Sequence, residues 1–264
     1  AYARSTGLAS RLKAGEYALT PGLTPRLLLD RIVAGRVIQY SLTIVEGWTF
    51  RQLRQTLASH PKLVQTLSGL SDAEVMARLG HPGEHPEGWF LPDTYHFPAG
   101  FTDEAFLRRA LAAMDQRLRE IWDRRAPGAP VNDPYQALIL ASIIEKETGV
   151  AAERVEIAGV FARRLRQGMR LQTDPAVIYG LGEAFDGNLR RRDLETDTPY
   201  NTYTRPGLPP TPIALPGIAA LEAAVNPASG DTLYFVADGE GGHVFSRTLE
   251  EHNRAVRRYQ LQGR

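Results

Sequence analysis

The chain has 264 residues, of which 43% are hydrophobic and 23% charged, a composition that excludes a disordered, collagen-like or coiled-coil protein. Its 31 basic and 30 acidic residues leave a net charge of +1, so no overall charge draws it to nucleic acid or to an anionic membrane. It has no cysteine, which excludes disulfides, cysteine nucleophiles and thiolate metal sites, and no apolar run approaches the ~20 residues of a membrane span.

A small strand–helix–strand unit is predicted at the start of the chain. Residues 16–19 favour a short strand. Thr24 is a good helix N-cap, Pro25 suits the first helical position, and Gly35 suits the end of that helix. Residues 37–45 are rich in β-branched side chains and alternate in part, which predicts a second strand. A unit of about 35 residues is too small to enclose a large core.

The remainder of the chain is predicted to be mainly helical, with a loop-rich stretch over residues 168–216. Residues 81–100 are punctuated by Pro and Gly but carry four aromatic side chains, which favours an ordered loop or a pair of short strands. Helices are expected at residues 47–57, 70–79, 103–122, 133–149, 153–167, 217–224 and 249–260, and hairpin strands at 232–237 and 243–246. We therefore expect an α+β fold, with a small βαβ module in residues 1–46 and a larger mixed domain in residues 47–264.

Two glutamates, Glu145 and Glu147, stand near the end of the apolar helix predicted at residues 133–149. Two positions on a helix correspond to about 200° of rotation, so these side chains face different sides and cannot form a carboxylate pair. Glu147 continues an apolar stripe with Ile143 and Ile144, which favours it weakly as a buried carboxyl. Such a carboxyl has a raised pKa and suits general acid catalysis. The residues alone leave open a simpler interpretation, in which the helix end turns polar where it meets solvent.

Polar and aromatic residues gather in two later segments. Gln172 and Asp174 lie in an otherwise apolar stretch, and hydroxyl, amide and aromatic side chains follow at Tyr200, Asn201, Thr202 and Tyr203. Aromatic faces beside amide and hydroxyl groups suit a sugar, whose ring stacks while its hydroxyls form hydrogen bonds. Five prolines between residues 206 and 216 would stiffen this loop and hold a site in place. A surface loop punctuated by Pro and Gly is the alternative.

Motifs for nucleotide binding, metal binding and a serine nucleophile are missing from the sequence. There is no Gly-rich dinucleotide loop after a strand, no Walker lysine loop and no G-x-S-x-G turn. His243 and His252 do not have the spacing of a helical metal pair, so we expect no metal and no cofactor. Instead, we expect His243 to begin a strand that pairs near Phe235, and His252 to pack on the last helix. A metal-dependent hydrolase using both histidines and Asp174 stays a rival hypothesis, which a chelator would test.

Several long motifs resemble those of the YceG-like family of endolytic murein transglycosylases. In chain order they are EGWFLPDTYHFPAG from Glu87, ASIIEKET from Ala141, RLRQGMRLQTDPAVIYG from Arg164, YNTYTRPGLPPTPIALPG from Tyr200 and YFVADGEGGHVFSRTLEEHN from Tyr234. The resemblance extends from residue 12 to residue 259. Because these long motifs occur in family order, the resemblance is specific.

The resemblance implies that the protein is a lytic transglycosylase, in which Glu147 matches the catalytic glutamate of the family. It implies non-hydrolytic cleavage of the β-1,4 bond between N-acetylmuramic acid and N-acetylglucosamine in nascent glycan strands, which leaves 1,6-anhydro ends. The βαβ module would be LysM-like. Whether Asp174 assists Glu147 stays open. The residues expected to bind substrate are Gln172, Asp174, Tyr200, Asn201, Thr202 and Tyr203, and all of these except Thr202 are expected to converge in one groove with Glu147. A non-catalytic peptidoglycan-binding scaffold is the alternative, although a scaffold has no need of a glutamate at this helix end.

The resemblance also implies where the protein works and with what. Family members act on the outer, periplasmic face of the bacterial cytoplasmic membrane, to which a single N-terminal helix anchors them. The chain begins with Ala1 and contains neither such a helix nor a signal sequence, so we expect it to be the exported part of a longer protein. Its expected partners are peptidoglycan glycan strands and, beside them, peptidoglycan synthases of the penicillin-binding class. No nucleic-acid partner is expected.

Overall fold

Helices dominate the computed structural model, which describes residues 2–261. Residue 1 and residues 262–264, the outer ends of the two predicted domains, lie outside the described residues. The described strands form two antiparallel pairs, β1 with β2 and β3 with β4, which confirms the α+β class. The main elements are α1 (Tyr2–Ser5), α2 (Pro25–Ala34), β1 (Gln39–Thr43), α3 (Phe50–Ser59), α4 (Asp72–Leu79), β2 (Thr94–Pro98), α5 (Asp103–Asp123), α6 (Pro134–Glu147), α7 (Arg154–Arg166), α8 (Asp174–Leu181), α9 (Arg191–Glu195), α10 (Ile218–Val225), β3 (Tyr234–Ala237), β4 (His243–Ser246) and α11 (Leu249–Val256), with single turns η1 (Ala9–Arg11), η2 (Ala151–Glu153), η3 (Gly182–Ala184) and η4 (Arg257–Leu261).

Capping side chains fix the starts of several helices, as the sequence predicts. The Thr49 hydroxyl accepts the Gln52 N–H at 3.3 Å while the Gln52 side chain accepts the Thr49 N–H at 2.8 Å, so a capping box opens α3. Ser71 and Glu74 form the same reciprocal pair at the start of α4. The helices predicted in these two segments are thereby confirmed.

The predicted βαβ module is wrong in its first strand, whereas β1 confirms the second. α2 forms as expected, but residues 16–19 form no strand, and their one backbone–backbone hydrogen bond runs from the Ile38 N–H to the Glu16 carbonyl at 2.8 Å. β1 pairs instead with β2 of the larger part, with Leu42 opposite Tyr95. Both of these side chains are buried in one apolar cluster, whereas Leu19 is 75% exposed. Strand pairing therefore follows the face that burial stabilises.

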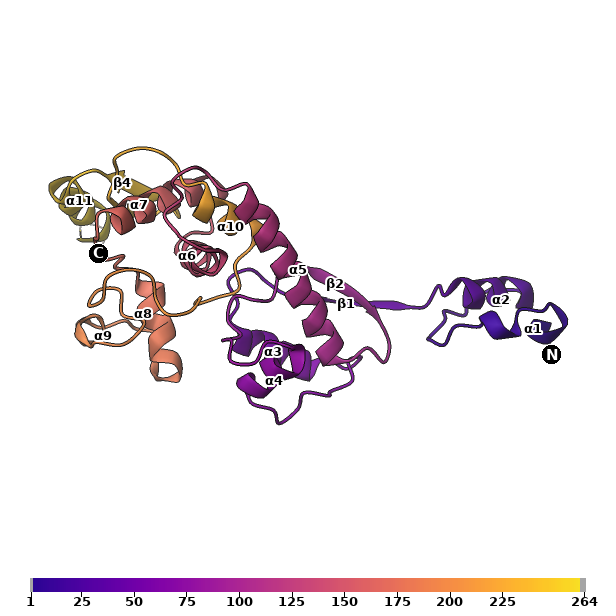
Figure 1. Cartoon of the computed structure of the whole chain (residues 1–264). Coiled ribbons are helices and arrows are strands. Elements are labelled where there is room, and N and C mark those ends of the chain that lie inside the picture. The colour runs from indigo at the N-terminus through magenta and orange to yellow at the C-terminus, as the bar shows by residue number, and fades with distance from the viewer. Residues whose placement is uncertain (1, 262–264) are drawn as a thin grey trace.

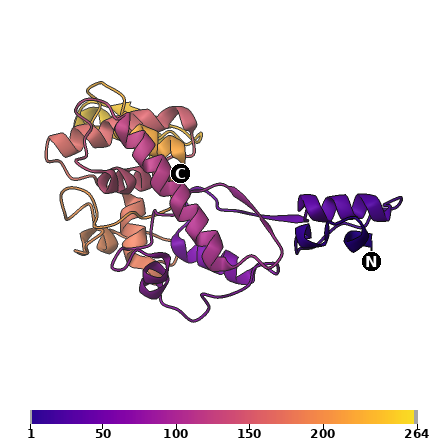
Figure 2. The ribbon, with the colours of Figure 1, turned by 45° about the vertical axis from the view of Figure 1, so that its right-hand side comes forward.

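The first part of the chain stands apart from the rest. Figures 1 and 2 show α1 and α2 projecting from the main body, joined to it through β1. Among residues 2–38, Leu29 is the only buried side chain. This segment therefore has almost no core of its own.

Two apolar clusters make up the main body, and α5 passes through both. Phe106 and Leu107 in its first half pack with α3, α4 and the β1–β2 pair, and Met114 and Leu118 in its second half pack with α6, α7 and α10. Since one continuous helix supplies both clusters, it holds them in a fixed relation.

α6 lies at the centre of the second cluster and positions the candidate site. Asp133 caps its first turn by accepting the Gln136 N–H at 2.8 Å, and every residue from 137 to 144 is buried. It contacts α5, α7, α8 and α10, which explains why it is apolar on all sides. The charged residues of α6 are confined to its last turn, where Glu147 lines the site. α8 begins at Asp174–Pro175, inside the stretch predicted to be rich in loops, and this helix was not predicted. A proline in the first turn, here Pro175, favours the start of a helix.

Candidate active site

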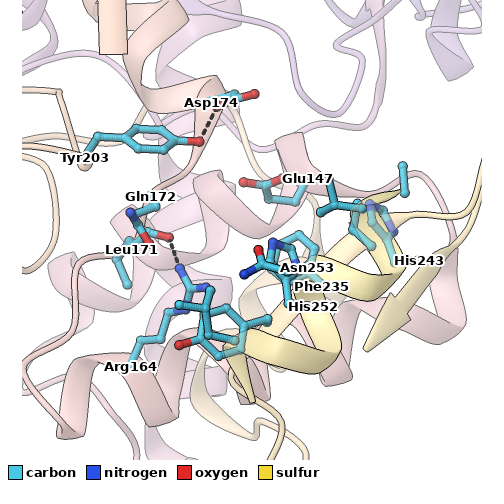
Figure 3. A pocket seen from close by; sticks show the side chains of 15 residues that line it. Glu147, Arg164, Leu171, Gln172, Asp174, Tyr203, Phe235, His243, His252 and Asn253 are labelled. Carbon is cyan, nitrogen blue, oxygen red and sulfur yellow. Dashed lines mark hydrogen bonds between the residues drawn. The ribbon is translucent and has the colours of Figure 1, made fainter. Parts of the chain in front are cut away.

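A cavity of about 530 Å³ opens beside the C-terminal end of α6. Four parts of the chain form its wall: the end of α6 with α7, the segment that leads into α8, the turn after α9 that carries Tyr203, and the β3–β4 hairpin with α11 (Figure 3). The side chains that line it are Glu147, Arg164, Leu171, Gln172, Asp174, Tyr203, Tyr234, Phe235, Val236, Ala237, His243, Leu249, His252, Asn253 and Val256.

Glu147 is the last residue of α6, and its carboxyl group faces this cavity (Figure 3). Burial raises the pKa of Glu147 to about 7. The adjacent Thr173 hydroxyl lowers this pKa, whereas the negative charge of Asp174 raises it further, and His243 and Arg164 act to lower it. Near neutral pH the group is therefore divided between its protonated and ionised forms, which is the state that suits a residue acting first as an acid and then as a base.

Glu145 is occupied by contacts within the protein. One carboxylate oxygen accepts the Gly217 N–H at the start of α10 at 2.9 Å, and the other lies 3.5 Å from the Arg154 guanidinium. Burial raises the pKa of Glu145 as well, while the Gly217 N–H opposes the shift. These contacts join the end of α6 to the start of α10 and to α7.

Three predicted substrate-binding residues share the cavity with Glu147. Gln172 and Asp174 are exposed, and the Tyr203 hydroxyl donates to Asp174 Oδ1 at 2.5 Å. Gln172 has a φ of +52°, a left-handed conformation that is uncommon for residues other than glycine. Backbone strain of this kind is often found at ligand sites, where the surrounding structure enforces it. The side chains of all three are accessible to a ligand in this cavity.

The structure does not place Tyr200, Asn201 and Thr202 in this cavity, so the expected convergence of Tyr200 and Asn201 on one groove with Glu147 is wrong. The Asn201 amide is fully buried and donates to the carbonyls of residues 193, 194 and 196. The Thr202 hydroxyl accepts the Thr173 N–H at 3.0 Å. Tyr200 packs edge-on against Tyr179 with ring centroids 5.1 Å apart. The polar atoms of Asn201 and Thr202 therefore hold the loop itself together.

Arg164 is a cavity residue that sequence reasoning did not single out. This arginine of α7 is 6% exposed, and it donates to the carbonyls of Leu233 at 2.7 Å and Leu171 at 2.8 Å. It thereby ties β3 to the segment carrying Gln172, and its guanidinium lies 5.2 Å from the Tyr234 ring centroid. Burial lowers the pKa of Arg164, but an arginine keeps its charge, so it places a positive charge beside Glu147.

His243 also faces the cavity, and a carboxylate orients it. Its Nδ1 atom lies 2.7 Å from Glu153 Oε2, and its backbone N–H donates to Glu153 Oε1 at 2.8 Å. As expected, it begins a strand that pairs with β3, and its ring packs against Phe235. Most of the cavity residues that were not predicted as site residues lie in the motif from Tyr234 to Asn253. The family resemblance of this motif could have identified them.

His252 lies within α11, and its ring packs on Tyr234 of β3 rather than on the last helix. The two rings stack with centroids 5.3 Å apart, and burial lowers the pKa of His252. Within residues 2–261, no group of three or more histidine, cysteine or acidic side chains is arranged to hold a metal ion.

The comparisons with known proteins agree with one another. A sequence model of the YceG-like family matches residues 1–258. A Bacillus subtilis protein named endolytic murein transglycosylase is 34% identical over 268 residues, which cover 95% of this chain and 74% of that relative. A Streptococcus pneumoniae protein of the same name is 31% identical over 287 residues, which cover 93% of this chain and 50% of that relative. The chain thus spans half the length of the streptococcal protein.

A solved structure has the same overall arrangement. The crystal structure of a yceG-like protein from Listeria monocytogenes superposes with a TM-score of 0.69 at 34% sequence identity. The match covers 96% of this chain and 88% of that one, so it includes both the N-terminal segment and the cavity.

Proposed function

Because the chain belongs to the YceG-like family, we propose that it is an endolytic murein transglycosylase, a lyase that cuts within peptidoglycan glycan strands. Its substrate is the β-1,4 bond between N-acetylmuramic acid and N-acetylglucosamine in nascent strands, and its product carries a 1,6-anhydro end. The observation that carries the proposal is Glu147, a half-buried carboxyl at a helix end whose pKa is about 7 and which faces an open cavity.

One carboxyl group suffices for this reaction. Neutral Glu147 donates its proton to the glycosidic oxygen, the bond from that oxygen to C1 of muramic acid breaks, and N-acetylglucosamine leaves with a free hydroxyl. The Glu147 carboxylate then takes the proton of the muramic C6 hydroxyl as that oxygen bonds to C1. No water is consumed, and Glu147 recovers its proton.

The other cavity residues support this role for Glu147. The charge of Asp174 favours the protonated form of Glu147 and so favours the acid step. We propose that the Gln172 amide, the Asp174 carboxylate and the Tyr203 ring bind the sugars on either side of the scissile bond. Their exposure in the cavity supports this assignment.

The products of glycan-strand digestion test the proposed reaction. Mass spectrometry of the fragments is expected to show muramic ends that are one water lighter than reducing ends. Asp174 lines the same cavity, and two carboxyl groups flanking a glycosidic bond can activate water for hydrolysis. Reducing ends would therefore overturn the transglycosylase in favour of a hydrolase, and uncut strands would favour a non-catalytic scaffold.

The pH dependence of cleavage tests the acid step. The pKa of Glu147 is about 7, so the protonated fraction falls about tenfold between pH 6 and pH 8. We expect initial rates at low substrate concentration to fall by a similar factor as the pH rises through 7. The affinity of a Glu147→Gln variant for glycan strands, measured at both pH values, corrects for effects on binding. A rate that increases through this range would contradict the proposal.

The N-terminal part of the chain is proposed to be a separate module. We retain residues 1–46 as a LysM-like, peptidoglycan-binding module ahead of a catalytic domain in residues 47–264. The projection of α1 and α2 from the main body supports a separate module, whereas the pairing of β1 with β2 ties its last strand to the catalytic part. Removing residues 1–38, which end before β1, should therefore leave the main body folded.

The location and partners of the protein follow from its proposed substrate. Peptidoglycan lies outside the cytoplasmic membrane, so we propose that the enzyme acts on the outer face of that membrane, anchored by one membrane-spanning helix. None of the helices between residues 2 and 261 has the length and apolar character to cross a bilayer. Nascent strands are the products of peptidoglycan synthases, and we propose that penicillin-binding proteins work beside it.

A further inference from the structure

A second cavity, of about 640 Å³, lies outside the candidate active site. It is bounded by the start of α3, by the segment over residues 85–87 and by the C-terminal half of α8. Its wall combines aromatic rings with charged and polar groups, and the residues that form it are Thr49, Phe50, Arg51, Gln52, Asp72, His85, Pro86, Glu87, Ile178, Tyr179, Gly182, Phe185 and Tyr200.

The two cavities share two structural elements. α8 presents Asp174 to the active-site cavity and Tyr179 to the second one. These residues are five positions apart on the helix, which is a rise of about 7.5 Å and a rotation of about 140°, so they lie on different faces of α8. The turn that follows α9 does the same, with Tyr203 in the first cavity and Tyr200 in the second. The two cavities therefore adjoin the same helix and the same turn.

A buried carboxyl fixes the shape of the second cavity. Glu87 is 3% exposed, and its two oxygens accept the Phe50 N–H at 2.8 Å and the Tyr179 hydroxyl at 3.0 Å. These bonds join the start of α3 to α8, two elements more than a hundred residues apart in the chain. The cavity is consequently preformed, which lowers the entropic cost of binding a ligand there.

We propose that this second cavity is a distal glycan subsite, which binds further sugar rings of the strand whose scissile bond lies at Glu147. The inference rests on the proposed function and deepens it. The half-buried ring of Phe185 and the edge-on pair of Tyr179 and Tyr200 offer apolar faces for sugar rings. At the rim, the exposed Arg51 guanidinium is paired with Glu183 at 2.7 Å and offers its remaining N–H groups as hydrogen-bond donors. An enzyme that cuts inside a strand needs contacts on sugars away from the scissile bond, and this cavity supplies them.

Binding of saccharides of two lengths tests the subsite. The Glu147→Gln protein serves as the parent, because it holds strands without cutting them. Its affinities for a tetrasaccharide and for long glycan strands are measured, and then repeated after adding Phe185→Ala or Arg51→Gln. We expect Phe185→Ala to lower the ratio of long-strand to tetrasaccharide affinity about tenfold, and Arg51→Gln to lower it about threefold.

Arg119→Gln is the matched control for Arg51→Gln. Arg119 is also exposed and paired with a carboxylate, at 2.8 Å, but it lies on α5 and lines neither cavity. Arg119→Gln should leave the ratio of long-strand to tetrasaccharide affinity unchanged. The subsite is overturned if both test variants keep the parent ratio, or if the parent binds long strands no better than the tetrasaccharide. Cleavage of strands by the unmodified chain, assayed separately, decides the proposed function, so the two failures are distinguishable.

Discussion

Replacing Glu147 by glutamine is expected to reduce glycan-strand cleavage by at least ~10²–10⁴-fold, the usual contribution of general acid–base catalysis. Glutamine keeps the size and the hydrogen-bonding shape of the side chain but has no acidic proton to donate to the glycosidic oxygen. The variant should still bind strands, because the rest of the cavity wall is unchanged. Initial rates of release of 1,6-anhydro fragments measure the effect.

The matched control is Glu145→Gln, two residues earlier on the same helix. Its amide oxygen can still accept the Gly217 N–H, although the charge pairing with Arg154 is lost. We expect most of the activity to remain. If Glu147→Gln released anhydro products at near the parent rate, the catalytic assignment would be wrong and attention would move to Asp174 or Glu145.

Glu147→Gln should increase the stability of the fold, although it reduces activity. Burial raises the pKa of Glu147 to about 7, so the native state holds this proton more tightly than the unfolded chain does. The parent therefore loses stability as the pH rises from the ordinary glutamate range through 7, whereas glutamine does not titrate. Denaturant unfolding at several pH values should show the variant gaining stability relative to the parent as the pH rises. A simultaneous loss of activity and gain of stability separates catalysis from folding.

Local signals explain why most helices were predictable. Thr49 with Gln52, and Ser71 with Glu74, are caps whose partners lie three residues away, so the chain encodes them within one turn. The strand predicted at residues 16–19 does not form, because strand pairing depends on partners that are distant in the chain. β1 is stabilised by β2, which lies more than fifty residues further along the chain, and no local pattern identifies that partner.

The site was predictable only in part, because polar side chains can face either a ligand or their own backbone. Glu147 was found from the helical pattern together with the family resemblance. Asn201 and Tyr203 were predicted from the same run of polar and aromatic residues. The Asn201 amide donates to loop carbonyls, whereas Tyr203 lines the cavity. Arg164 and His243 reach the cavity through tertiary contacts with Leu171 and Glu153, which spacing along the chain does not reveal.

A second large effect is expected at Gly88, which adjoins the buried Glu87. Gly88 has a φ of +89°, and a Cβ atom there would lie 2.6 Å from Pro212 Cγ and 3.2 Å from Leu138 Cδ2. Gly88→Ala therefore combines backbone strain with overpacking against a rigid proline ring and the central helix. We expect it to lower the free energy of unfolding by about 3 kcal/mol. For a chain of this size, that corresponds to a fall in Tm of roughly 6–12 °C.

Gly83→Ala separates the two causes. Gly83 has almost the same φ, +84°, but a Cβ atom there would meet nothing within 4 Å. This control carries the strain alone and should cost about 1 kcal/mol. Thermal unfolding followed by circular dichroism compares the two. Equal losses would mean that the contact of Gly88 with Pro212 contributes nothing, whereas a larger loss at Gly88 shows that the segment bearing Glu87 is held against the central helix by close packing that only glycine permits.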